Sequence, residues 1–246
     1  MLPEKKSVKY FYKLIILNDS SLFNLSVFVP KLIYGVDILG MQKLYLDIET
    51  LPADEQSYKA LKLLFAKKKE KAKGTGKYVC DFEQWLLGTS FDGAFGQILC
   101  IGYAANNEPA GVIFNDKNEK KTLEQFWQMA NDFNLFIGHN IMDFDLRFIY
   151  QRSIVQKVRP TLDLNFARYR SAPIFDTMKE WVKWANMTVG LEHLALALGI
   201  PTPKDGIDGS QVFDFYRKGK IEEILKYCQR DVETTRAVYK RIIFEG

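Results

Sequence analysis

Two pairs of side chains, one early in the chain and one late, have types and spacing that could support chemistry. Tyr227 and Asp231 stand four residues apart in the segment 221–243, which is predicted to be a helix, so they share one helix face, one turn apart. Asp47 and Glu49 close an apolar segment that predicts a buried strand, and residues two apart in a strand share a face. Two carboxylates side by side at a strand end are unfavourable unless a cation binds there.

A third polar segment, from Asn140 to Asp145, follows a short predicted strand and enters a predicted helix. Asp143 stands where that helix should begin, and we interpret it as the N-cap. Asp145 is therefore the better candidate for a metal ligand. Two roles stay open for Asn140: it could cap the turn or contact a nucleotide. We interpret His139 as a packed or hydrogen-bonded side chain and not as a base.

Together these segments favour metal-dependent cleavage of a phosphodiester. Oxygen ligands suit Mg²⁺ or Mn²⁺, and a pair of such ions can stabilise both the attacking and the leaving oxygen. The expected metal ligands are Asp47, Glu49, Asp145 and Asp231. Tyr227 alone would be an ordinary half-buried helix tyrosine. Beside these acids it becomes a candidate to orient an attacking water or to help deprotonate it.

Composition limits the class of protein. With 246 residues, 47% of them hydrophobic, the chain suits one large α/β domain. A net charge of +4 does not by itself establish nucleic-acid binding. Three cysteines without paired spacing and only two histidines exclude a histidine-rich zinc site and favour a reducing, cytoplasmic setting. We expect no membrane span, because no clean apolar run of about 18 residues is present.

The strongest local charge lies between Lys59 and Lys77, where eight lysines accompany one acid, Glu70. Two interpretations stay open. The segment could be a solvated helix face or a mobile loop, as charge runs usually are. It could instead be a flap that binds phosphates beside a reactive site, which its position soon after Glu49 favours.

The first 40 residues differ from the rest: a basic, aromatic stretch is followed by an interrupted apolar one. Met41 directly precedes the first convincing strand. We therefore predict that 1–40 is an N-terminal extension that is not necessarily native, with Met41 as the natural start. The alternative is a genuine extension that packs on the domain. Residues 41–246 are predicted to form the main domain, with a lysine-rich insertion at about 54–90.

Within the main domain, strand and helix patterns alternate. Strands are predicted at 43–48, 98–105, 111–115 and 135–138, with a strand end at 174–177. Helices are predicted at 122–134, 143–152, 191–198, 211–217 and 221–243. This order predicts the α/β class, with one mixed sheet covered by helices on both faces.

Three of these segments resemble the exonuclease motifs of the DEDD superfamily: Leu46-Asp47-Ile48-Glu49-Thr50, Gly138-His139-Asn140-x3-Phe144-Asp145 and Tyr227-x3-Asp231. Tyrosine at 227 is typical of the tyrosine branch. The chain is most similar to stand-alone relatives of the proofreading domain of family B DNA polymerases, over roughly Met41 to the end, including Gly209-Ser210-Gln211-Val212. The resemblance implies a ribonuclease H-like fold, a mixed β-sheet flanked by helices, and metal-dependent 3′–5′ cleavage.

The resemblance also implies substrate contacts. Thr50 and Leu51 would contact the terminal nucleotide, and Asn140 and Phe144 the adjoining strand. Single-stranded DNA is the implied substrate, and RNA stays an alternative because no residue pattern indicates recognition of a 2′-hydroxyl. A third hypothesis is an inactive nucleic-acid-binding module of the same fold. The presence of all four acids argues against this hypothesis. We expect any proofreading role to be in trans, beside a polymerase or repair partner.

Overall fold

The structure is a computed structural model that describes residues 32–33, 36–37, 41–202 and 207–245. The predicted extension, 1–40, lies almost wholly outside the described residues, so that prediction is not tested. Only two short strands of it are described, β1 (Leu32–Ile33) and β2 (Val36–Asp37), which pair antiparallel. Within the described part of the chain, no helix is both long and apolar enough to cross a membrane.

A five-stranded mixed sheet organises the main domain, in the order β5-β4-β3-β6-β7. Its strands are β3 (Lys43–Leu51), β4 (Gln97–Ala105), β5 (Gly111–Phe114), β6 (Leu135–Gly138) and β7 (Ile174–Asp176). The first three pair antiparallel, whereas β6 and β7 run parallel to β3. Because the carboxyl ends of parallel strands meet at one edge of a sheet, the segments that follow β3, β6 and β7 come together there.

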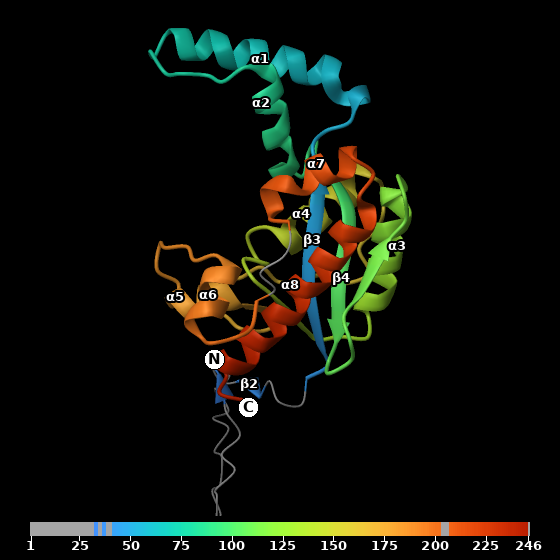
Figure 1. Cartoon of the computed structure of the whole chain (residues 1–246), viewed down its shortest axis with the longest axis vertical. Helices are drawn as coiled ribbons and strands as arrows, with labels where there is room; N and C mark the ends of the chain where they lie inside the picture. The colour runs from blue at the N-terminus through green and yellow to red at the C-terminus, as the bar shows by residue number, and fades with distance from the viewer. Residues whose placement is uncertain (1–31, 34–35, 38–40, 203–206, 246) are drawn as a thin grey trace, which may run out of the picture. The chain divides into compact units, whose positions relative to one another are not determined.

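Helices cover both faces of this sheet (Figure 1). The helices of the described residues are α1 (Tyr58–Lys73), α2 (Phe82–Leu87), α3 (Glu119–Ala130), α4 (Asp145–Val155), α5 (Thr177–Val182), α6 (Leu191–Ala197), α7 (Val212–Arg217) and α8 (Ile221–Ile242), of which α1 and α2 lie beyond the end of β3. Three short 3₁₀ turns are η1 (Glu55–Ser57), η2 (Gly88–Phe91) and η3 (Gly209–Gln211). The predicted α/β class and mixed sheet are confirmed.

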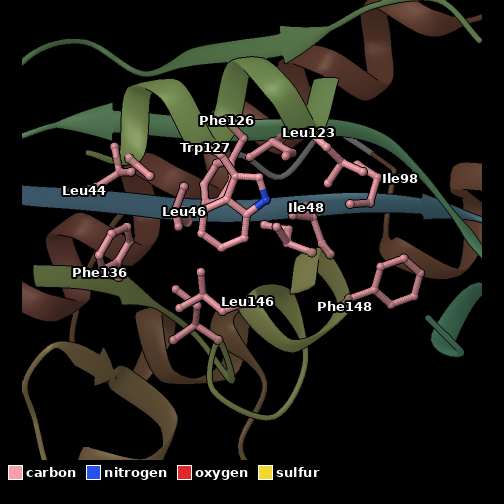
Figure 2. Close-up of a cluster of buried hydrophobic side chains, with 14 of the residues drawn as sticks. Leu44, Leu46, Ile48, Ile98, Leu123, Phe126, Trp127, Phe136, Leu146 and Phe148 are labelled. Atoms are coloured by element: carbon pink, nitrogen blue, oxygen red, sulfur yellow. The ribbon is translucent and has the colours of Figure 1, made fainter. Parts of the chain in front are cut away.

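Side chains along β3 alternate between the two faces of the sheet, and the two acids lie on one of them. Leu44, Leu46 and Ile48 are buried against α3 and α4 in a cluster that includes Trp127 (Figure 2). Each such side chain contributes about 1.5–3 kcal/mol by leaving water. Tyr45 faces the other way, into a cluster under α8. Asp47 and Glu49 continue the face of Tyr45, so strand alternation turns both acids toward α8.

Gly102 of β4 allows α8 to lie close to the sheet. It is the cross-strand partner of Asp47. A Cβ at this position would lie 2.7 Å from Cys228 Sγ and 2.9 Å from Val232 Cγ2 of α8, so any larger residue would displace these side chains or the helix. The glycine therefore brings the turn of α8 that carries Tyr227 and Asp231 down onto the acids of β3.

Most predicted elements are present, with boundaries shifted by a few residues. Helix α3 begins at Glu119, before the predicted 122, because the Asn118 side chain accepts the N–H of Lys121 as an N-cap. It ends at Ala130, not at 134. The insertion at about 54–90, for which the sequence predicts no particular helix, contains α1 and α2.

The predicted N-cap role of Asp143 is wrong. Helix α4 begins at Asp145, and its N-cap residue, Phe144, offers no side-chain acceptor. The carboxylate of Asp143 instead pairs with Lys179 at 2.7 Å and lies 3.9 Å from Arg147. A cation distant in sequence thus competes successfully with the local helix N-terminus for this acid.

Candidate active site

The structure brings the four predicted metal ligands together from three elements. Asp47 and Glu49 come from β3, Asp145 is the first residue of α4, and Asp231 lies in α8. Burial raises the pKa of Asp47 well above its ordinary value, and the charges of Asp145 and Asp231 raise it further. Burial and then the charge of Asp47 do the same to the pKa of Glu49. These four carboxylates therefore act on one another as one electrostatic group.

The two remaining acids respond in the same direction. Burial raises the pKa of Asp145 from 3.8 to about 7 and that of Asp231 from 3.8 to about 6. A hydrogen bond from Tyr227 partly offsets the rise at Asp231. Such shifts are expected where buried carboxylates are gathered without a cation, and they cluster at functional sites.

Asp145 is positioned by the part of β3 that extends beyond its pairing with β6. Strand β6 pairs with β3 only from Lys43 to Tyr45. Beyond that point, the N–H of Ile48 donates to Asp145 Oδ1 at 3.0 Å. This bond fixes the start of α4 between the two acids of the strand. Next to it, the pairing of β3 with β4 shifts register between Glu49 and Thr50, an irregularity common beside active sites.

Tyr227 donates its hydroxyl to Asp231, one turn further along α8. Burial raises the pKa of Tyr227 well above its ordinary value, and the charges of Asp231 and Glu49 raise it further. The phenol is therefore neutral at physiological pH. With its single O–H directed to Asp231, the phenol oxygen can accept a hydrogen bond from a water molecule, but a neutral phenol does not act as a base.

Sequence reasoning missed Cys228. Its Sγ and the carboxylates of Asp47 and Glu49 offer three ligand atoms within 4.8 Å of one another. The thiol donates to Asp47 Oδ2 at 3.5 Å. A hydrogen bond with Cys100, followed by burial, raises the pKa of Cys228 well above its ordinary value, so the group is a thiol in the metal-free protein. As a thiol, Cys228 stabilises the position of Asp47 by hydrogen bonding. The four carboxylates then form an all-oxygen donor set, which fits Mg²⁺ or Mn²⁺.

Asp176, at the end of β7, is a second residue that sequence reasoning missed. Its carboxylate accepts the N–H of Asn140 and the N–H of Met142, each at 3.1 Å. It also accepts N–H groups at the start of α5, as that helix's N-cap. Asn140 has a φ of 61°, in the left-handed region that non-glycine residues rarely adopt. Asp176 thus holds the loop before Asp145 in shape; the sequence signal was an Asp between a strand and a helix.

The four predicted substrate contacts lie in different surroundings. The Thr50 hydroxyl donates to the carbonyl of Ser90 at 2.8 Å. Leu51 is buried in a hydrophobic cluster. Asn140 and Phe144 are half-buried. The ring of Phe144 lies 6.0 Å from that of Phe91.

The sequence did not indicate Phe91 as a site residue. In the structure, 73% of its surface is exposed. An exposed ring of this kind is suited to stacking on a planar group. His139, by contrast, is a packed side chain as expected: its ring nitrogens bond to Thr177 Oγ1 and to the carbonyl oxygen of Val189, at 2.9 and 2.7 Å.

A family model described as a predicted 3′–5′ exonuclease related to the exonuclease domain of PolB matches residues 110–245, more than half of the chain. The chain belongs to this family. Asp145, Tyr227 and Asp231 lie inside the matched residues of this predicted PolB-related exonuclease, and the strand that carries Asp47 and Glu49 precedes them. A comparison with curated proteins found no match.

Among solved structures, the chain is similar to the family B DNA polymerase from the hyperthermophilic archaeon Pyrobaculum calidifontis. The TM-score is 0.57 at 13% sequence identity, over 82% of this chain and 24% of the polymerase. The chain therefore spans about a quarter of the polymerase's length. At this identity the likeness concerns the fold, which is the ribonuclease H-like fold that the motifs implied.

Proposed function

We propose that this protein is a metal-dependent 3′–5′ exonuclease that shortens single-stranded DNA. One observation carries the proposal: four carboxylates and a neutral phenol from β3, α4 and α8 converge at one place in a member of a predicted exonuclease family. Gathering these acids is electrostatically unfavourable in the protein alone, which favours a site made for cations.

The metal ligands would be Asp47, Glu49, Asp145 and Asp231. Two Mg²⁺ or Mn²⁺ ions held there would supply Lewis-acid stabilisation of the charge that develops on the scissile phosphodiester. Hydrogen bonds within the protein would keep these ligands in position. The N–H of Ile48 fixes Asp145, and the thiol of Cys228 donates to Asp47.

Tyr227 would orient the attacking water. Its hydroxyl interacts with Asp231, so the phenol oxygen lies beside the carboxylates and can accept a hydrogen bond from the water. Because its pKa is raised, we assign it orientation and not deprotonation. We assign substrate contacts to Thr50 and Leu51 at the terminal nucleotide and to Asn140 and Phe144 along the strand.

An assay with end-labelled oligonucleotides tests this function. The protein is incubated with 5′-labelled single-stranded DNA and RNA of one sequence, in Mg²⁺, in Mn²⁺ and in excess chelator. We expect a ladder that shortens from the 3′ end in either metal and none in chelator. Asp145→Ala should abolish the ladder, whereas Asp143→Ala, two residues away and paired with Lys179, should keep most of it.

Each other outcome has a meaning. Undiminished cleavage in chelator would overturn the metal-dependent mechanism. Faster shortening of RNA than of DNA would make the protein an exoribonuclease. Binding of the labelled strand without any cleavage would make the protein an inactive binding module.

A further inference from the structure

The segment between β3 and β4 contains two packed helices. We call residues 54–90 the arm. It lies outside the residues that the family model matches. Helix α1 has 16 residues, which corresponds to a length of about 24 Å. Figure 1 shows α1 and α2 beyond the end of β3, with α1 extending away from the sheet.

An aromatic seam holds the two helices of the arm together. Phe65 of α1 is buried, and its ring lies 5.4 Å from that of Phe82 and 5.3 Å from that of Trp85 in α2. Leu61 of α1 is buried with Leu86 of α2 in the cluster at the base of the arm. These contacts make the arm a packed element and not a loose loop.

The arm carries eight lysines and five acids, and only one of these acids, Glu70, lies within the lysine-rich segment 59–77. All eight lysines between 59 and 77 are exposed. Within residues 41–202 and 207–245, none of them pairs with an acid in the structure. Three lie over rings of the seam: Lys62, Lys68 and Lys69. The others project from the arm without such a partner: Lys59, Lys67, Lys71, Lys73 and Lys77. A cluster of exposed ammonium groups without ion pairs is complementary to a polyanion.

Both ends of the arm return to the candidate active site. At its start, β3 ends only two residues after Glu49, and η1 begins at Glu55. At its end, α2 leads into η2, where the Ser90 carbonyl accepts the Thr50 hydroxyl. The exposed ring of Phe91 in η2 lies beside Phe144. A strand that leaves the site past these two rings would be directed toward the arm.

We propose that the arm binds the sugar–phosphate backbone of the substrate strand several nucleotides 5′ of the terminus being cleaved. This inference rests on the proposed function. With a spacing of about 3.4 Å per nucleotide in a stacked strand, the 24 Å of α1 matches about seven nucleotides. Lysine contacts to phosphate carry no sequence information. The arm therefore sets affinity for long strands, independently of sequence, without taking part in the reaction.

A triple variant tests the arm while leaving its seam intact. Lys67→Gln, Lys71→Gln and Lys73→Gln change only lysines that touch no ring, and glutamine keeps helix propensity. The matched control removes three cations elsewhere: Lys157→Gln, Lys240→Gln and Arg241→Gln. Steady-state cleavage of a 20-nucleotide strand and of a trinucleotide is measured for both variants and the parent at 50 and 200 mM salt, after circular dichroism has shown equal folding.

The expected result is specific to strand length and to salt. Each lost phosphate contact should flatten the salt dependence on a log–log plot by about 0.7. Between the two salt concentrations, the parent's affinity for the long strand should then fall roughly 15–20-fold more than that of the arm variant. At 50 mM salt the arm variant should have a higher KM on the 20-mer, with kcat and the trinucleotide KM unchanged. The control should match the parent.

Two results would overturn the arm proposal: an arm variant that matches the parent on the long strand, or one impaired equally on the trinucleotide. If the parent cleaves neither substrate, the proposed exonuclease function fails, and the arm is then judged by fluorescence anisotropy of a labelled 20-mer. Equal binding by parent and arm variant in that measurement would rule the arm out as a nucleic-acid contact and favour a protein partner. Weaker, less salt-dependent binding by the arm variant alone would support it.

Discussion

Replacing Asp145 with asparagine should stabilise the metal-free protein while removing its nuclease activity. Asp145 is only 4% exposed, and burial raises its pKa from 3.8 to about 7 even though its carboxylate accepts the N–H of Ile48. The asparagine side chain would have nearly the same shape, and its Oδ1 could still accept that N–H. The variant would lose the charge, which is unfavourable in the empty site and required for metal binding.

The sign of the effect follows from the direction of the pKa shift. A carboxyl group whose pKa is higher in the folded state favours folding while protonated, and that contribution is lost as the pH rises through its folded pKa. For Asp145 it is fully present below about pH 4 and lost above about pH 7. At about 1.4 kcal/mol per unit, the shift corresponds to at most about 4 kcal/mol at pH 8. For a domain of this size that is a difference in Tm of about 8–16 °C.

The assay is thermal unfolding of parent and Asp145→Asn in chelator, at pH 5 and at pH 8. We expect the variant's advantage to be small at pH 5 and large at pH 8. Mg²⁺ should narrow or reverse the gap, because only the parent binds it well when folded. Asp143→Asn is the control, since this exposed acid pairs with Lys179. A variant that is less stable than the parent by the same amount at both pH values would refute the reasoning and make Asp145 an ordinary structural acceptor.

Two further substitutions separate chemistry from positioning. Tyr227→Phe keeps the ring and removes the hydroxyl bound to Asp231; kcat should fall by about 10²–10⁴-fold with little change in KM, and a change in KM alone would contradict the orienting role. Asp176→Asn should turn an amide N–H toward a backbone N–H that the carboxylate now accepts, at Asn140 or Met142. Thermal unfolding should show a loss of about 1–3 kcal/mol, and kcat should also fall; an unchanged kcat would mean that the loop tolerates the change.

Local patterns were sufficient to predict the central strand and the last helix. In β3, apolar residues on both faces indicate a buried strand, and its period of two already places Asp47 and Glu49 on one face. In α8, the spacing of Tyr227 and Asp231 determines their common face before any packing is known. These predictions succeeded because strand and helix periods depend on the chain alone.

The features that sequence missed depend on contacts between distant residues. Helix α1 buries only Leu61 and Phe65, too few to give a clear apolar stripe, and the rings that cover Phe65 come from α2. Asp143 has the local features of an N-cap, but Lys179 binds it. The role of Asp176 becomes visible only when β6 and β7 lie side by side.

The same strand provides both the stability and the electrostatic strain of this site. Leu44, Leu46 and Ile48 anchor β3 from one face, and Tyr45 anchors it from the other, so Asp47 and Glu49 cannot move apart to relieve their repulsion. A more flexible strand would let the acids separate and would weaken any metal site. Packing on both faces therefore keeps these acids buried and close together, and burial first, with repulsion second, raises the pKa values of Asp47 and Glu49. Removing a charge here should stabilise the metal-free fold and abolish the activity.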